Sequence, residues 1–365
     1  MTLFLPSSER DLRLDLFRGL ANWAIFLGHI PNTVLAWFTP RHYGFSDGAD
    51  LFVFVSGYTA TLVFGRMMVQ RGFLIGATRL LRRVWQLYVA HALLFLFYLT
   101  SVHFLSHNFN IPHLMDQFNV ARLMEFPVET LTQGLILKFK PLNLDVLPLY
   151  IVLMAMFPPV LWLMLLHKNW VLVGSLSLYF TARHFHWNLP SYPEGDWYFN
   201  PFTWQLLFVL GAWLAAGGAR TIRSLLDARF ILVPGVIFLL FASAATLSTQ
   251  VPALQTPFSI ALFEPFSPND KTNLAPYRVI HLLALALLIV KFIHFDWPGL
   301  RWPVFRPVIK CGQQSLEVFC VGVFLSFIAH FILDATSDAL PVQILVGAGG
   351  LCLMTAVAYY RSWSE

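Results

Sequence analysis

The sequence predicts an all-α protein that crosses a membrane many times. The chain has 365 residues, of which 57% are hydrophobic and only 12% are charged. Its mean hydropathy is +0.64, whereas soluble domains carry about twice this share of charged residues. Aromatic residues make up 16% of the chain, which is typical of proteins with aromatic belts at the membrane interfaces. We therefore expect a polytopic helical bundle, surrounded by membrane lipid, that forms one domain over residues 1–365.

About ten stretches are apolar enough to span a bilayer, which takes about 20 residues of helix. The mixed segment from Asn119 to Phe139 suits an interfacial helix, and the Pro-rich stretch from Ser248 to Pro276 suits an irregular loop. The expected spans, of which the fifth and sixth are short, are Leu12 to Trp37, Ala49 to Met68, Val84 to Phe104, Leu144 to Leu166, Asn169 to Phe185, Phe199 to Gly217, Phe230 to Leu247, Tyr277 to Phe295, Val308 to Leu333, and Leu340 to Tyr360.

The basic residues predict an orientation for this bundle. Loops on one side, together with both chain ends, hold about twice the Lys and Arg of the opposite loops, and such loops stay in the cytoplasm. Both termini are therefore expected in the cytoplasm, and the loop from Phe38 to Gly48 is expected outside it. The first apolar stretch lacks a small-residue cleavage pattern, so we expect it to remain as the first helix.

The remaining composition argues against several classes of function. The net charge of +5 follows the loops and forms no nucleic-acid motif, so no nucleic-acid partner is expected. Cys311, Cys320 and Cys352 lie in apolar runs without metal-ligand spacing and are interpreted as core residues. The sequence has no Walker loop or dinucleotide fingerprint. We predict neither a metal nor a permanently bound cofactor.

The first predicted helix carries a stripe of polar residues. Arg18 and His29 are eleven positions apart, so they lie on nearly one helix face, roughly 16 Å apart along the axis. Asp15 and Asn22 fall close to the same stripe. Polar residues inside a membrane generally face a functional cavity, although Asp15 pairing with Arg18 and His29 packing in the core are the simpler alternatives. Four aligned polar residues favour a functional site.

Two aspartates lie where the second predicted span begins. Asp47 and Asp50 are three residues apart at a helix start, where Asp is favoured as a capping residue. Capping explains Asp47 better than Asp50, which sits at the edge of an apolar run. A carboxylate near His29 would orient the imidazole and raise its basicity, as in catalytic His–carboxylate pairs.

These motifs resemble the OpgC protein family, within the acyltransferase-3 superfamily of membrane acyltransferases. The generic superfamily pattern lacks the paired aspartates. The resemblance implies a multi-pass protein of the bacterial inner (cytoplasmic) membrane that transfers succinyl from succinyl-CoA to hydroxyls of periplasmic glucan. The stretches that carry it are Asp11-Leu-Arg-Leu-Asp15-Leu-Phe-Arg18-Gly19, the Arg18–His29 spacing, Gly44-Phe-Ser-Asp47, Phe-Val-Phe-Val-Ser-Gly-Tyr before Thr59, Trp197-Tyr-Phe-Asn200-Pro-Phe-Thr-Trp204-Gln205, and Gly312-Gln313-Gln314-Ser315-Leu316.

The resemblance also suggests roles for the first polar stripe. His29 would be the general base that removes the proton of a sugar hydroxyl, and transient acylation of His29 is left open. Arg18 would contact the CoA donor, and Asp47 or Asp50 would set the His29 tautomer. Asp15 and Asn22 are further candidates for binding the donor or substrate.

A basic cluster that includes Arg82 and Arg83 is a candidate for binding the CoA phosphates. Topology signalling and contact with anionic lipid are the alternatives for these arginines.

Further candidate binding residues lie in the second half of the chain. Arg278 and His281 share a helix face after Lys271, and this cationic group would hold the free carboxylate of a succinyl group. We expect both cations to lack an acidic partner nearby, and interfacial anchoring is the alternative.

Asn200, Trp204 and Gln205 suit a sugar acceptor through stacking and amide hydrogen bonds. Placement in an ordinary interfacial aromatic belt is the alternative.

Two other classes of function stay open from the sequence. A transporter or flippase for a glycan or organic anion would also need polar residues in the membrane, although no inverted repeat is evident. A membrane sensor without chemistry is the third. The acyl group, the acceptor, the route of the acyl group across the membrane and a homo-oligomeric state are not fixed by the sequence.

Overall fold

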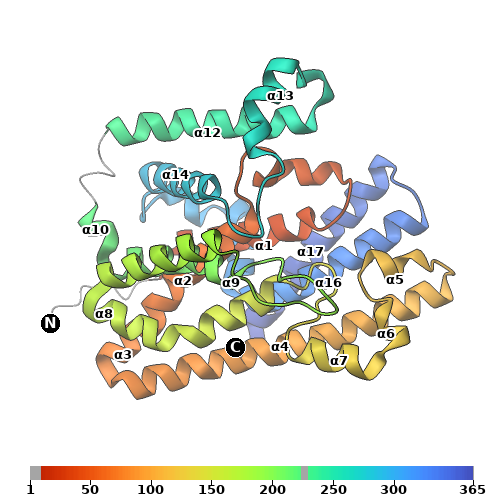
Figure 1. The fold of residues 1–365 in the computed structure, drawn as a ribbon, viewed down its shortest axis with the longest axis horizontal. Helices are drawn as coiled ribbons and strands as arrows, with labels where there is room; N and C mark the ends of the chain where they lie inside the picture. Colours follow the sequence, from red (N-terminus) through yellow and green to blue (C-terminus); the bar gives the residue numbers. More distant parts are fainter. Residues whose placement is uncertain (1–9, 223–228, 365) are drawn as a thin grey trace.

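The computed structural model describes residues 10–222 and 229–364, and in these residues the prediction of an all-α fold is confirmed. Figure 1 shows the long helices running side by side across the view, with α12 above α14, α4 along the lower edge and the short α5–α7 at one end. The principal helices are α1 (Leu12–Gly28), α2 (Gly48–Ala60), α4 (Phe73–Asn108), α8 (Val146–His184), α9 (Pro201–Trp213), α12 (Arg229–Gln250), α14 (Pro276–Phe292), α15 (Arg306–Gln313), α16 (Ser315–Ala335) and α17 (Leu340–Ser364).

Shorter helical segments connect these elements. Two π-helical stretches continue longer helices: η3 (Thr61–Gly65) follows α2, and η4 (Leu214–Gly218) follows α9 and is kinked at Gly217 (φ 94°, ψ 11°). The predicted interfacial segment around residues 119–139 forms two short helices, and the expected irregular loop before α14 also contains one. The remaining short α-helices are α3 (Arg66–Arg71), α5 (His113–Gln117), α6 (Arg122–Glu125), α7 (Pro127–Leu135), α10 (Ala219–Thr221) and α13 (Pro257–Phe263).

Seven helical stretches in the described chain are long and apolar enough to cross a membrane, compared with the ten predicted spans. The protein is therefore a multi-pass membrane protein, but the count of ten is not confirmed. One reason is that the first and eighth predicted spans become α1 and α14, each only 17 residues long, which rise about 26 Å at 1.5 Å per residue.

The other reason is that the fourth and fifth predicted spans join into α8. This helical run has 39 residues and leaves helical geometry at His167 (φ −141°, ψ 62°). A straight helix of that length would be nearly twice the thickness of a bilayer core. The ninth predicted span is also interrupted, because Gln314 (φ −106°, ψ 45°) separates α15 from α16.

Glycines let two pairs of helices approach at backbone contact. A Cβ atom added to Gly312 of α15 would lie 1.7 Å from a carbonyl oxygen of α1, and one added to Gly19 would lie 1.9 Å from a carbonyl oxygen of α15. Gly57 of α2 and Gly211 of α9 meet the facing backbone in the same way, at 1.9 and 2.0 Å. Small residues are the usual means of such close contact between membrane helices.

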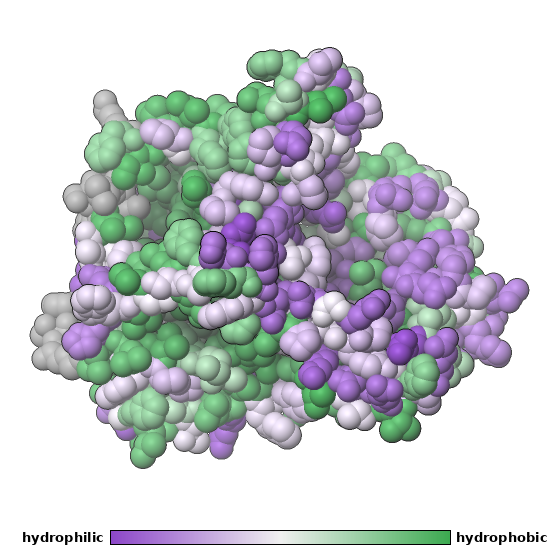
Figure 2. Space-filling model, in the orientation of Figure 1, coloured by the Kyte–Doolittle hydropathy of each residue, from purple (hydrophilic) through white to green (hydrophobic). Residues whose placement is uncertain are grey.

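These crossings bring several helix ends together at one place. The C-terminal end of α1 and the N-terminal ends of α2, α8 and α14 all contribute residues to one cavity, together with the segment before α9. Hydrophilic residues gather near the centre of the face in Figure 2, between α12–α13 and the rest of the bundle, whereas hydrophobic residues cover much of the long helices. The fold therefore places polar residues from distant parts of the chain around a shared space.

Candidate functional site

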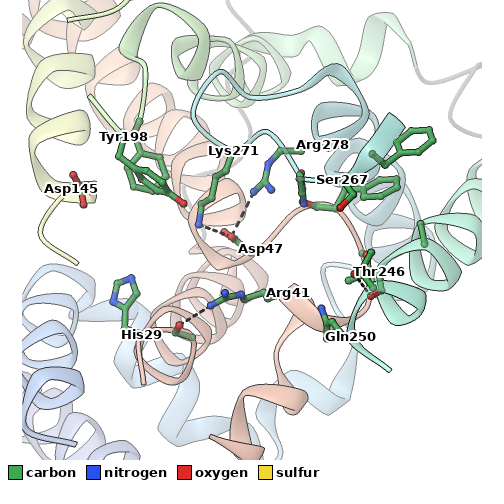
Figure 3. Close-up of a pocket in the computed structure, with 18 of the residues that line it drawn as sticks. His29, Arg41, Asp47, Asp145, Tyr198, Thr246, Gln250, Ser267, Lys271 and Arg278 are labelled. Atoms are coloured by element: carbon green, nitrogen blue, oxygen red, sulfur yellow. Dashed lines mark hydrogen bonds and ion pairs between the residues drawn. The ribbon is translucent and has the colours of Figure 1, made fainter. Parts of the chain in front are cut away.

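A cavity of about 490 Å³ contains His29, the candidate base. Figure 3 shows its charged and aromatic residues, which come from well-separated stretches of the sequence. One wall consists of residues of α12 and the loop before α14. The labelled lining residues are His29, Arg41, Asp47, Asp145, Tyr198, Thr246, Gln250, Ser267, Lys271 and Arg278.

His29 follows the last residue of α1 and caps that helix. Its backbone N–H donates to the carbonyl oxygen of Ile25 at 3.1 Å, so the imidazole leaves the helix end at the cavity. The ring Nδ1 is buried and has no hydrogen-bond partner among the described residues. Burial, followed by the positive charge of Lys271, lowers the pKa of His29 below its ordinary value. The ring is therefore neutral at pH 7, as a general base must be.

Asp47 is the centre of an ion-pair cluster beside His29. One carboxylate oxygen accepts the backbone N–H of Ala49 at 2.8 Å, which caps α2, and the other accepts Lys271 Nζ at 2.6 Å. Arg278 Nη2 lies 3.6 Å from the same oxygen. Burial alone would raise the pKa of Asp47, but the charges of Lys271 and Arg278 outweigh it and hold this pKa well below the ordinary value.

Asp50 lies behind this cluster and is fully buried. Its carboxylate accepts Arg278 Nη2 at 2.5 Å and the backbone N–H of Asp47 at 2.9 Å, which completes a capping box. The expectation that Arg278 lacks a local acid is therefore wrong. Its acids are more than 200 residues away in the sequence, where local spacing could not reveal them.

His281 is also engaged in packing and hydrogen bonding. Its Nδ1 lies 2.7 Å from the hydroxyl oxygen of Ser46. A Cβ atom added to Gly44 would lie 2.0 Å from His281 Nε2, so only a glycine fits against the ring. With Arg278 and His281 each 2% exposed, the predicted cationic pair supports the Gly44–Asp47 turn. Arg278 lines the cavity, but its guanidinium is already paired with Asp47 and Asp50.

The proposed orientation of His29 by an aspartate has no direct contact in the described structure. Asp47 shares the cavity with His29, but neither Asp47 nor Asp50 forms a hydrogen bond with the imidazole within residues 10–222 and 229–364. Their role as partners of His29 therefore stays a prediction. The structure places their ion-pair cluster beside the cavity that His29 faces.

Asp145 is a cavity residue that the sequence analysis missed. It precedes α8, faces the same cavity as His29, and has no hydrogen bond or ion pair to another side chain in the described chain. Burial raises the pKa of Asp145 to about 6, against the opposing charge of Lys140. An acidic residue directly before an apolar span was the available signal, the same signal that drew attention to Asp47.

The three residues predicted to bind sugar, Asn200, Trp204 and Gln205, do not line the cavity but bond to residues around it. Asn200 caps α9 and donates to the side chain of Asn273 at 3.0 Å. Trp204 is fully buried, and its Nε1 donates to the backbone oxygen of Lys271 at 2.9 Å. Gln205 bonds to Ser175. Stacking of a sugar on Trp204 is therefore wrong, because its ring is enclosed by protein.

The other residues of the predicted stripe lie away from the cavity. Asp15 pairs with Arg10 at 2.6 Å, so the alternative of a pair with Arg18 is not what the structure shows. The Asn22 amide donates to the Ser315 backbone at 3.2 Å, but its oxygen has no partner among the described residues. Arg18 Nε is buried and also lacks one there.

The basic residues of α4 are further candidates outside the cavity. Arg82 is exposed, and Arg83 donates to Gln86 at 3.1 Å.

Comparison with known proteins agrees with this arrangement of motifs. A family model described as "OpgC protein" matches residues 10–365, which is nearly the whole chain. No curated protein and no solved structure matches significantly. Because one family model covers the cavity residues and all the described helices, the chain belongs to the OpgC family.

Proposed function

We propose that the protein is a membrane O-acyltransferase of the bacterial inner membrane that transfers succinyl from cytoplasmic succinyl-CoA to hydroxyls of periplasmic glucan. Membership of the OpgC family supports the reaction class. The observation that carries the site assignment is the position of His29, a neutral imidazole at the end of α1 that faces a cavity of about 490 Å³.

His29 supplies the base in this proposal. As the sugar hydroxyl attacks the thioester carbonyl, its proton passes to the imidazole and the new C–O bond forms. The C–S bond then breaks, and the imidazolium returns the proton to the departing CoA thiolate. This direct transfer needs no covalent intermediate, while an acyl-imidazole on His29 is the two-step alternative.

The donor is proposed to reach His29 along α1. Arg18 lies eleven positions before His29, roughly 16 Å along a helix axis, a spacing that a pantetheine arm can bridge. The buried Nε of Arg18 and the amide oxygen of Asn22 have no hydrogen-bond partner among the described residues, so these atoms are suited to polar groups of that arm. Arg82 and Arg83 are proposed contacts for the CoA phosphates.

The acceptor is proposed to enter from the other wall of the cavity. Tyr198 is 49% exposed and presents a ring for stacking on a sugar. Thr246 and Gln250 of α12 add hydrogen-bonding groups, and the Asp145 carboxylate accepts hydroxyl hydrogens. A mixture of an aromatic face, a hydroxyl, an amide and a carboxylate suits a glycan hydroxyl better than a lipid tail.

The test is release of free CoA by the purified protein given succinyl-CoA, with and without a neutral oligomeric β-glucan. We expect glucan-dependent release in the wild type and a loss of at least a hundredfold in His29→Asn, because general bases contribute about a hundredfold or more. His103→Asn, a change of a histidine that does not line the cavity, is the matched control and should keep full activity.

Two results would count against this function. If folded wild-type protein releases no CoA from any acyl-CoA, the acyltransferase proposal fails. Transport of a glycan or organic anion then becomes the hypothesis to test. If His29→Asn keeps wild-type release, the reaction stands but His29 is not its base. Detection of succinyl on the glucan by mass spectrometry separates transfer from simple thioester hydrolysis.

A further inference from the structure

The cations around the cavity divide into two groups. Lys271 and Arg278 face Asp47 and Asp50 at 2.5–3.6 Å. Two positive and two negative side chains therefore balance within that cluster. A neutralised cluster of this kind has little remaining attraction for a further anion.

Arg41 forms the second group, because it is not part of this ion-pair cluster. It lies in the short 3-10 helix η2 (Pro40–His42), lines the same cavity and has no carboxylate within 4.0 Å among the described residues. Its Nη1 donates to the backbone oxygen of Gly28 at 2.9 Å. That carbonyl is at the C-terminal end of α1, where a helix favours a positive charge.

This bond places the exposed Arg41 side chain beside the candidate base. The carbonyl that it holds belongs to the residue directly before His29, and Figure 3 shows the Arg41 side chain crossing toward that helix end. One N–H of the guanidinium is used by Gly28, and the others remain for a ligand. A planar guanidinium with free N–H groups is suited to a carboxylate, which it binds through two parallel hydrogen bonds.

We propose that Arg41 binds the free carboxylate of the acyl group and thereby selects a dicarboxylic acyl donor. This inference rests on the proposed acyltransferase function and replaces Arg278 and His281 as the recognition site. In a succinyl group, two methylenes separate the free carboxylate from the thioester carbonyl. A carbonyl held at His29 therefore places the carboxylate near a cation anchored at the neighbouring residue. Without such a partner, the charge would be costly to bring into the cavity.

The test compares donors that differ only at the distal group. CoA release with neutral β-glucan is measured for succinyl-CoA, for its monomethyl ester and for butyryl-CoA, which has the same chain length without the carboxylate. We expect wild-type kcat/KM to be about ten- to a hundredfold higher for succinyl-CoA, since hydrogen bonds to a charged group contribute about that much. Because the acceptor is neutral, an anionic group on the glucan cannot produce this difference.

Arg41→Gln should remove that preference selectively. We expect kcat/KM for succinyl-CoA to fall to the level of butyryl-CoA, with butyryl-CoA turnover unchanged, and Arg41→Lys to keep part of the preference. Arg122→Gln, which removes an arginine outside the cavity, is the matched control and should behave as wild type.

Three results would overturn the assignment. Equal turnover of succinyl-CoA and its methyl ester by the wild type excludes carboxylate recognition, whether or not any variant folds. An equal loss for all donors in Arg41→Gln, with a normal melting temperature, gives Arg41 another role. Selectivity that survives in Arg41→Gln places the recognition elsewhere. In each case wild-type CoA release still reports on the proposed function separately.

Discussion

The two ends of the polar stripe on α1 differ in how their charges are satisfied. At the C-terminal end, Asp47, Asp50, Lys271 and Arg278 form a balanced cluster in which every charge has an opposite partner within 4.0 Å. In the N-terminal half, the buried Nε of Arg18 has no hydrogen-bond partner within the described chain. The ion-pair cluster is held by its own contacts, whereas Arg18, like Nδ1 of His29, keeps hydrogen-bonding capacity that no described residue uses.

This difference indicates that the two regions have different roles, one in stability and one in ligand binding. A balanced ion-pair cluster fixes the turn before α2 and the loop before α14, and so holds the walls around His29 without help from substrate. A cation whose buried Nε has no hydrogen-bond partner among the described residues costs stability, so its retention points to a ligand. The first region should therefore be sensitive to mutation mainly through stability, and the second mainly through activity.

Breaking the cluster at Asp50 should give the largest effect. Asp50→Asn leaves Arg278 buried beside one remaining carboxylate, and removing one partner of a buried pair costs about 3–5 kcal/mol. Thermal unfolding in detergent should show the loss, with Asp116→Asn, an exposed aspartate, unchanged. The double variant Asp50→Asn/Arg278→Met should recover much of it. A melting temperature equal to wild type in Asp50→Asn would contradict the assigned structural role.

The α1–α15 crossing tests whether the N-terminal half of α1 depends on packing more than on charge. A Cβ on Gly312 would lie 1.7 Å from the Asp15 carbonyl oxygen. Gly312→Ala should therefore push the helices apart and destabilise the protein by about 1–3 kcal/mol. Gly349→Ala is the matched control, since nothing lies within 4 Å of its added Cβ. Equal melting temperatures for the two variants would mean that α1 and α15 do not cross at backbone contact.

The comparison also shows which features the sequence could reveal. Apolar length and composition predicted the all-α membrane fold, because a bilayer imposes both on any spanning helix. Local spacing predicted Asp47 as a helix cap, and the structure confirms it. Spacing could not predict the pairing of Asp50 with Arg278 or the burial of Trp204, since these depend on contacts between segments far apart in the chain.

Asp145 and Arg41 were missed for a related reason. Arg41 is a single charged residue in a predicted loop, and nothing near it in the sequence marks it as different from a solvent-exposed charge. Asp145 carried only the signal of an acidic residue at the start of an apolar span. Only the meeting of α1, α8 and the 38–48 loop around one cavity brings them to His29. The helix break at His167 falls at the predicted boundary between the fourth and fifth spans, where His167, Lys168 and Asn169 interrupt the apolar run. The break at Gln314 was not predicted, although it lies in the polar run Gln313-Gln314-Ser315.

Arg18→Met should separate the two regions most clearly. Arg18 is half-buried, and its Nε has no hydrogen-bond partner among the described residues. Replacing such a charge by an apolar side chain of similar length is often neutral or stabilising, so the melting temperature should stay equal or rise. CoA release from succinyl-CoA should nevertheless fall about ten- to a hundredfold in kcat/KM, because a charged contact to the donor is lost. Arg278→Met is the informative counterpart and should instead lower the melting temperature. Full activity in Arg18→Met would remove Arg18 from the donor site.

The smallest expected effect is a pH dependence that belongs to Asp145. Burial raises the pKa of Asp145 to about 6, so its carboxylate is protonated below that pH and charged above it. If the charged form binds the acceptor hydroxyls, kcat/KM for glucan should rise between pH 5 and pH 7 with a midpoint near 6. His29 should not contribute in this range, because its own pKa is lowered and the ring is already neutral.

Asp145→Asn should flatten this acid limb and lower the plateau by up to about tenfold, while the melting temperature measured across the same pH range controls for unfolding. An acid limb that persists unchanged in Asp145→Asn would assign the titration to another group, and the unpaired carboxylate would then be a feature of the cavity wall without a part in binding the acceptor.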